Sequence, residues 1–158
     1  VPIMSITMER GLVDQSDKFK KRIASNNISK YKLVKRNELV VGFPIDEGVL
    51  GFQTKYEYAA VSPAYDVWKL KTKCNVEILE LILRSKQARE TYKRFIRGTA
   101  NRRRVVPKDV FVEITIPDPK SPIVSGVPSL LSDKLQLEND LMKNKTKIEE
   151  TIEEVWGK

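Results

Sequence analysis

A proline-rich segment divides this sequence into two parts of different character. Residues Pro117 to Pro128 contain four prolines and one glycine, a composition that interrupts helices and strands alike. From Ser129 onward there is no proline, and the only glycine is Gly157. The pattern predicts a folded domain over residues 1–127 and a separate helical segment over residues 128–158.

The second part has the periodicity of one long amphipathic helix. Apolar side chains recur at steps of three, four and seven residues, in a row interrupted by lysines, and they are Leu130, Leu137, Leu141, Ile148, Ile152 and Val155. A helix of about 28 residues would be near 40 Å long. Its length and one-sidedness favour a coiled-coil arm whose Leu137, Leu141, Ile148 and Ile152 face another helix. The alternative is a helix folded back on the sheet of the first domain.

The first part alternates between strand and helix patterns, which predicts an α+β domain with a mixed or antiparallel sheet. Strands are expected at residues 1–7, 31–34, 39–43, 56–61, 65–70 and 110–116, with a loop from Pro44 to Gly51. Asn75 is a favourable N-cap, and the apolar spacing after it predicts a single helix from Val76 to Phe95.

The net charge of +8 is unevenly distributed. Residues 1–110 hold 23 basic and 12 acidic side chains, whereas residues 111–158 hold 6 basic and 9 acidic ones. The densest basic stretch, KRFIRGTANRRR from Lys93 to Arg104, has six basic residues and no acidic residue. A cationic domain with a mildly acidic tail predicts a polyanion as the partner of the domain.

Double-stranded DNA is the polyanion that these side chains suit best. Arginine on a turn fits phosphate and the guanine edge, and amide side chains fit adenine. The candidate contacts are Lys93, Arg94, Arg97, Asn101, Arg102, Arg103 and Arg104, with Gln53, Lys55 and Tyr56 on a neighbouring loop. Further basic residues, including Lys35, Arg36 and those of the segment 69–73, are interleaved with tyrosines. The bland alternative is a solvated loop, and the helix dipole alone accounts for part of the charge at Lys93 and Arg94.

The composition removes several kinds of chemistry. Without histidine, the usual general base and the common nucleophile pairs are missing. Asp46, Glu47 and Lys55 imitate a degenerate Mg²⁺-dependent nuclease pattern, which stays open as an alternative. The main prediction is a protein without catalytic residues, bound metal or cofactor. A protein-interaction module with a basic surface is the other alternative.

The single cysteine, Cys74, is expected to be a small buried residue in a protein of a reducing, cytoplasmic location. No apolar run is long enough to span a bilayer and no signal-peptide pattern opens the sequence, so no membrane partner is expected. Because a predicted strand follows Val1 directly, we expect the chain to begin inside a longer natural sequence.

The order of several short motifs resembles the target recognition domain of type I restriction-modification specificity subunits. The motifs are Y-x-L-V-x-x-x-E-L-V at Tyr31 to Val40 and A-x-V-S-P-A-Y-x-V at Ala59 to Val67. A helix, a glycine-to-arginine turn from Gly98 to Arg103, and Ile-x-Ile-Pro-x-Pro from Ile114 to Pro119 follow in the family's order. A long helix comes next in the family, as is expected here from Ser129.

The resemblance implies a non-catalytic subunit that selects DNA for separate modification (methyltransferase) and restriction subunits. Each recognition domain of the family binds one half of a split site, and long helices pair antiparallel as a spacer. The sequence has one such domain, and the segment KSPIVSGVP replaces the family's usual Glu-Gln-x-x-Ile pattern after Pro119. The arm would therefore pair either with a second recognition domain or with a second copy in a homodimer.

Overall fold

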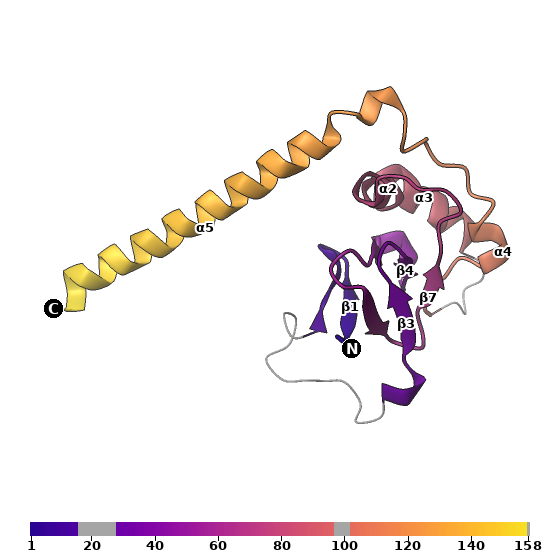
Figure 1. The fold of residues 1–158 in the computed structure, drawn as a ribbon, viewed down its shortest axis with the longest axis horizontal. Coiled ribbons are helices and arrows are strands. Elements are labelled where there is room, and N and C mark those ends of the chain that lie inside the picture. Colours follow the sequence, from indigo (N-terminus) through magenta and orange to yellow (C-terminus); the bar gives the residue numbers. More distant parts are fainter. Residues whose placement is uncertain (16–27, 97–101, 158) are drawn as a thin grey trace. The chain divides into compact units, whose positions relative to one another are not determined.

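The computed structural model of the protein describes residues 1–15, 28–96 and 102–157, which form two compact units, Val1–Pro119 and Lys120–Lys158. The first unit combines antiparallel strand pairs with short helices, and the second contains one long helix (Figure 1). The predicted α+β class with a long C-terminal helix is confirmed.

The described residues of the first unit contain seven strands in three antiparallel groups. These are β1 (Met4–Thr7) with β2 (Gly11–Asp14), β3 (Lys32–Lys35) with β6 (Tyr58–Val61), and β4 (Leu39–Val41) between β5 (Leu50–Phe52) and β7 (Asp66–Trp68). A parallel bridge between Ile3 and Ala60 joins the first two groups. Five of the six predicted strands are present.

Strand β4 lies between two hydrophobic cores. Leu39 belongs to the core that also contains Leu50, whereas its neighbour Val40 belongs to the core of β1, β3 and β6. Successive side chains of a strand point to opposite faces, so the adjacent Leu39 and Val40 supply one core each. Both faces of β4 are therefore packed, and this packing fixes the positions from which the chain leaves the two ends of the strand.

The predicted loop from Pro44 to Gly51 is partly wrong, because β5 begins at Leu50. Gly51 is a strand residue whose missing side chain allows the backbone of β2 to approach. A Cβ at Gly51 would lie 2.6 Å from the backbone nitrogen of Leu12, closer than packed atoms allow. The glycine therefore marks a close approach of two strands and not a turn.

The predicted single helix is two helices, α2 (Val76–Leu83) and α3 (Lys86–Phe95). Asn75 is the N-cap of α2, as predicted, and accepts hydrogen bonds from the backbone N–H groups of Glu77 and Ile78. Ser85 starts α3 in the same way by accepting from the Ala88 N–H. Ser85 is thus a second N-cap, which the apolar spacing of a continuous helix did not indicate.

Glu80 of α2 connects the helices to the sheet. Its carboxylate accepts a hydrogen bond of 2.8 Å from the backbone N–H of Phe52 in β5 and lies 3.5 Å from the Arg84 guanidinium. Burial raises the pKa of Glu80, against the opposing effects of the Phe52 N–H and Arg84. The Glu80–Arg84 pair therefore contacts β5 as well as solvent.

The strand predicted at residues 110–116 is wrong. A short helix, α4 (Lys108–Phe111), occupies its start, and the rest has no regular structure. Phe111 packs against Trp68 with ring centroids 5.1 Å apart, and Ile114 and Ile116 pack against the same core. Val110, Ile114 and Ile116 are therefore partly buried against the core as an irregular segment, whereas Val112 is exposed.

Tyr92 of α3 offers a test of this packing. It is fully buried, and its hydroxyl donates a 2.7 Å hydrogen bond to the Leu83 carbonyl at the end of α2. Tyr92→Phe leaves that carbonyl without the hydroxyl, and we expect a loss of about 1–2 kcal/mol in the free energy of unfolding by chemical denaturation. Tyr58→Phe, at an exposed position, is the control and should change stability by less than about 0.5 kcal/mol. Equal effects of the two substitutions would contradict this role of Tyr92.

The second unit consists mainly of α5 (Val127–Gly157), a helix of 31 residues with no buried residue. Its predicted pairing residues are all exposed, from 53% for Ile152 to 69% for Leu137. A short 3-10 helix, Pro122–Val124, precedes it. Within the described part of the second unit, no other element covers the apolar row of α5.

Candidate nucleic-acid interface

Residues 102–104 end the basic stretch, and the contacts of Arg104 fix their position. Arg104 lies 3.2 Å from Asp46 and 2.7 Å from Glu47, and its carbonyl accepts a hydrogen bond from the Ile45 N–H. These contacts hold Arg104 in a left-handed backbone conformation, with φ of 51°. The side chain and carbonyl of Arg104 thus both contact the short 3-10 helix η2 (Ile45–Glu47).

Arg102 and Arg103 remain exposed on the outside of this fixed segment. The Arg103 guanidinium lies 5.1 Å from the ring centroid of Phe43, which itself packs edge-on against Tyr65 at 5.9 Å. Neither arginine forms an ion pair with a described acidic residue. Two arginine forks are therefore presented to solvent, and that of Arg103 lies over an aromatic ring.

Lys93 and Arg94 lie exposed in the last turn of α3, where the helix dipole favours positive charge. Arg94 donates to the Thr91 hydroxyl at 3.2 Å, and neither residue pairs with a described acidic side chain. The predicted contacts Arg97 and Asn101, and the turn that begins at Gly98, lie outside the described residues.

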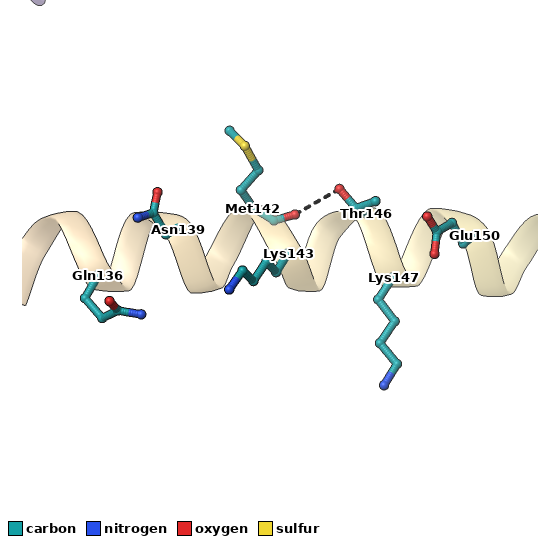
Figure 2. A pocket seen from close by; sticks show the side chains of 7 residues that line it. All are labelled: Gln136, Asn139, Met142, Lys143, Thr146, Lys147 and Glu150. Atoms are coloured by element: carbon teal, nitrogen blue, oxygen red, sulfur yellow. Dashed lines mark hydrogen bonds between the residues drawn. The ribbon is translucent and has the colours of Figure 1, made fainter.

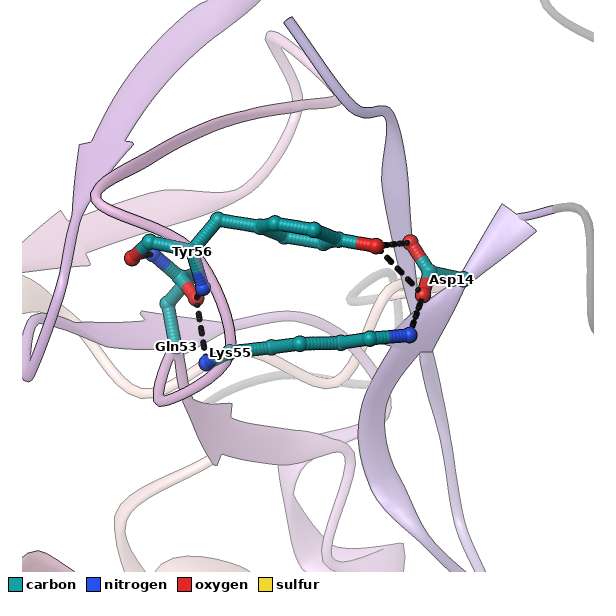
Figure 3. A network of polar contacts seen from close by, with 4 residues as sticks. All are labelled: Asp14, Gln53, Lys55 and Tyr56. Carbon is teal, nitrogen blue, oxygen red and sulfur yellow. Dashed lines mark hydrogen bonds and ion pairs between the residues drawn. The ribbon is translucent and has the colours of Figure 1, made fainter.

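The predicted loop of Gln53, Lys55 and Tyr56 is a tight polar network around Asp14 (Figure 3). Gln53 is fully buried; its amide oxygen accepts from the backbone N–H groups of Lys55 and Tyr56, and its amide nitrogen donates to the Tyr56 carbonyl. Gln53 therefore holds the turn together, and its amide groups are not presented to a base.

Asp14, at the end of β2, holds the two other side chains of the turn. The Tyr56 hydroxyl donates to its carboxylate at 2.9 Å, and the Lys55 ammonium pairs with the same group. Burial works to raise the pKa of Asp14, but the hydrogen bonds from Lys55 and Tyr56 outweigh it and lower the pKa below its usual range. Lys55 is half exposed, so an anion would reach its ammonium only in competition with Asp14.

The lowered pKa of Asp14 predicts a pH-dependent contribution to stability. A carboxyl group whose pKa is lower in the folded state stabilises the protein above its ordinary pKa, and this contribution disappears as the pH falls through the lowered value. We expect Asp14→Asn to lower the free energy of unfolding by about 1–2 kcal/mol at pH 7. Denaturation series at several pH values should show the difference from wild type shrinking below about pH 4. A difference that is constant with pH would contradict the ionised role of Asp14.

A cationic groove of about 650 Å³ lies between the β3–β4 turn and the segment from β7 to α2. We use this name for its five basic lining residues, Lys35, Arg36, Lys69, Lys71 and Lys73. All five are exposed and none forms an ion pair with a described acidic residue. Glu38, the acidic lining residue, is buried and accepts from the Lys35 backbone N–H.

The groove joins the loop of Lys55 through one arginine. Arg36 donates to the carbonyls of Thr54 and Lys55, at 3.3 and 3.4 Å. The basic residues of the groove were noted in the sequence but were not among the predicted contacts, because they come from two segments more than thirty residues apart. Only the pairing of β4 with β7 brings the two segments together.

The Mg²⁺ nuclease alternative finds little support in the geometry. Arg104 pairs with both Asp46 and Glu47, and the Lys55 ammonium pairs with Asp14 instead of with either of them. Over residues 1–15, 28–96 and 102–157, no group of three or more acidic or cysteine side chains is arranged to hold a metal ion.

Comparisons with known proteins add no relative. The chain matches no protein-family model, no curated protein and no solved structure. None of the described helices is both long and apolar enough to cross a membrane. The fold and the surface therefore define the class: an α+β protein with an exposed cationic surface on the first unit and a long amphipathic helix in the second.

Proposed function

We propose that the protein is a sequence-specific DNA-binding module, the specificity component of a type I restriction-modification system or a fragment of one. It binds one half of a split site and delivers modification and restriction subunits to it. The observation that carries the proposal is the pair Arg102 and Arg103, both exposed and without a described acidic partner, with Arg103 over the Phe43 ring. Arginine forks in this state suit guanine and phosphate.

The exposed row of α5 supports the second half of the proposal, which is pairing with another helix. The row is nearly symmetric: Leu141 and Ile148 are equally far from the midpoint between Asn144 and Lys145, and so are Leu137 and Ile152. An antiparallel second copy therefore places Leu141 opposite Ile148. Such pairing keeps the apolar positions of both helices in register along the contact.

Charge also favours the antiparallel arrangement. A parallel arrangement would place Lys134 of one copy against the same lysine of the other, whereas the antiparallel one places Lys134 opposite Val155. We therefore propose a homodimer through α5, with two equal DNA-binding units and a symmetric split site.

The opposite face of α5 is polar and suits solvent. Figure 2 shows this face, a hollow lined by α5 alone through Gln136, Asn139, Met142, Lys143, Thr146, Lys147 and Glu150. One helix cannot enclose a ligand, so the hollow is open surface. Its polarity leaves the Leu137–Ile152 side of the helix as the face for pairing.

Selection from a pool of random duplex DNA by the full chain tests the proposed function. We expect the enriched sequences to share two inverted half-sites separated by a constant spacer. A pool that stays random after repeated rounds, or a single half-site without a repeat, would contradict the proposal or its dimeric form, respectively.

A further inference from the structure

The cationic groove differs from the Arg102–Arg103 surface in the kind of side chain that surrounds its charges. Its lining residues include no tyrosine, phenylalanine or tryptophan. Arg103, in contrast, lies over Phe43, which packs against Tyr65. Aromatic rings are the surfaces on which unpaired bases stack, so the groove lacks the means to hold a base.

The two surfaces also lie at opposite ends of β4. The groove includes Asn37 and Glu38, just before the strand, whereas Phe43 follows it. Six residues in extended conformation would separate Asn37 from Phe43 by roughly 20 Å. A duplex bound at Arg102 and Arg103 can extend over this distance. A different part of its phosphate backbone would then contact the groove.

Lysines supply four of the groove's five positive charges, and they come from both walls. Lysine is a compact point charge without the planar fork that identifies guanine, so it suits phosphate more than a base edge. The ammonium of Lys35 lies 5.9 Å from the Tyr58 ring centroid, and Arg36 is held by the carbonyls of Thr54 and Lys55. The lysines on the opposite wall, Lys69, Lys71 and Lys73, are thus the charges most open to a ligand.

We infer that this groove binds the phosphate backbone of duplex DNA without regard to sequence, while base selection is confined to the other end of β4. The inference rests on the proposed function. It assigns phosphate binding to the groove and base recognition to the Arg102–Arg103 surface. Neutralised phosphates release counterions, so each lysine contact adds about 0.9 to the slope of log affinity against log salt.

The test replaces Lys69, Lys71 and Lys73 with glutamine in the full chain and measures affinity for selected and scrambled duplexes between 50 and 200 mM salt. The first unit also supplies a matched control, because Arg10, Lys30 and Lys86 are exposed basic residues outside the groove and outside the candidate DNA contacts. Arg10→Gln, Lys30→Gln and Lys86→Gln make the same charge change there. Since all three groove lysines are exposed, thermal unfolding should be unchanged and serves as the check on folding.

The groove variant is expected to lower the salt slope by about 2–3 on both duplexes, and the control to leave it unchanged. The ratio of affinities for the two duplexes should stay as in wild type. An unchanged slope, or a slope lowered equally by the control, would overturn the inference, as would a loss of selectivity in the groove variant. Wild-type protein that prefers no duplex would instead overturn the proposed function, so the two failures are distinguishable.

Discussion

Replacing both Arg102 and Arg103 with alanine is expected to weaken binding to the selected duplex by roughly 30-fold or more, at about 1–3 kcal/mol for each arginine. Both side chains are exposed and lack a described acidic partner, so no described carboxylate competes with DNA for them. Arg104 is left in place because its pairs with Asp46 and Glu47 hold the segment. Titrations of labelled duplex by fluorescence anisotropy measure the change.

Two further variants separate base recognition from charge. Arg10→Ala with Lys30→Ala removes the same charge from exposed positions of the same unit and should weaken binding far less. Arg102→Lys with Arg103→Lys keeps the charge but removes the planar forks, so binding to scrambled DNA should persist while selectivity falls. If the alanine pair binds the selected duplex as tightly as wild type, Arg102 and Arg103 are not DNA contacts.

Placing glutamate at Leu141 and Ile148 is expected to weaken self-association of the protein by at least about 100-fold. In the antiparallel arrangement each substitution appears twice, and each removes an apolar side chain worth about 1.5–3 kcal/mol on full burial. The carboxylates would also lie opposite one another without water. Sedimentation equilibrium over a range of concentrations measures the association constant.

The polar face of α5 provides the control. Asn139→Glu with Thr146→Glu adds the same charge at the same spacing of seven residues, on the face that Figure 2 shows. This variant should associate as wild type does. Equal weakening by both variants would indicate a general charge effect, and a wild-type protein that stays monomeric at high concentration would contradict pairing with a second copy.

The long helix and most strands were predictable because their signals are local. The break at Pro117 to Pro128 and the spacing of Leu137, Leu141 and Ile148 lie within single segments of the sequence. The errors occurred where tertiary contacts decide the local structure. Gly51 resembles a turn residue until β2 approaches it, and residues 110–116 alternate like a strand although no neighbouring strand pairs with them.

The candidate site was harder to predict, for the same reason. The sequence identifies Arg104 as one of three equivalent arginines, but only folding brings Asp46 and Glu47 within reach of it. Gln53 has the right chemistry for adenine, yet it is buried in its own turn. The cationic groove forms only when β4 pairs with β7, and no local sequence pattern predicts that pairing.

The most direct test of sequence-specific DNA binding is the ratio of affinities for the selected duplex and a scrambled duplex of equal length and composition at one physiological salt concentration. A specificity module should bind the selected duplex about a thousandfold more tightly, or better. Equal affinity for the two duplexes would contradict the account, whatever the absolute strength of binding.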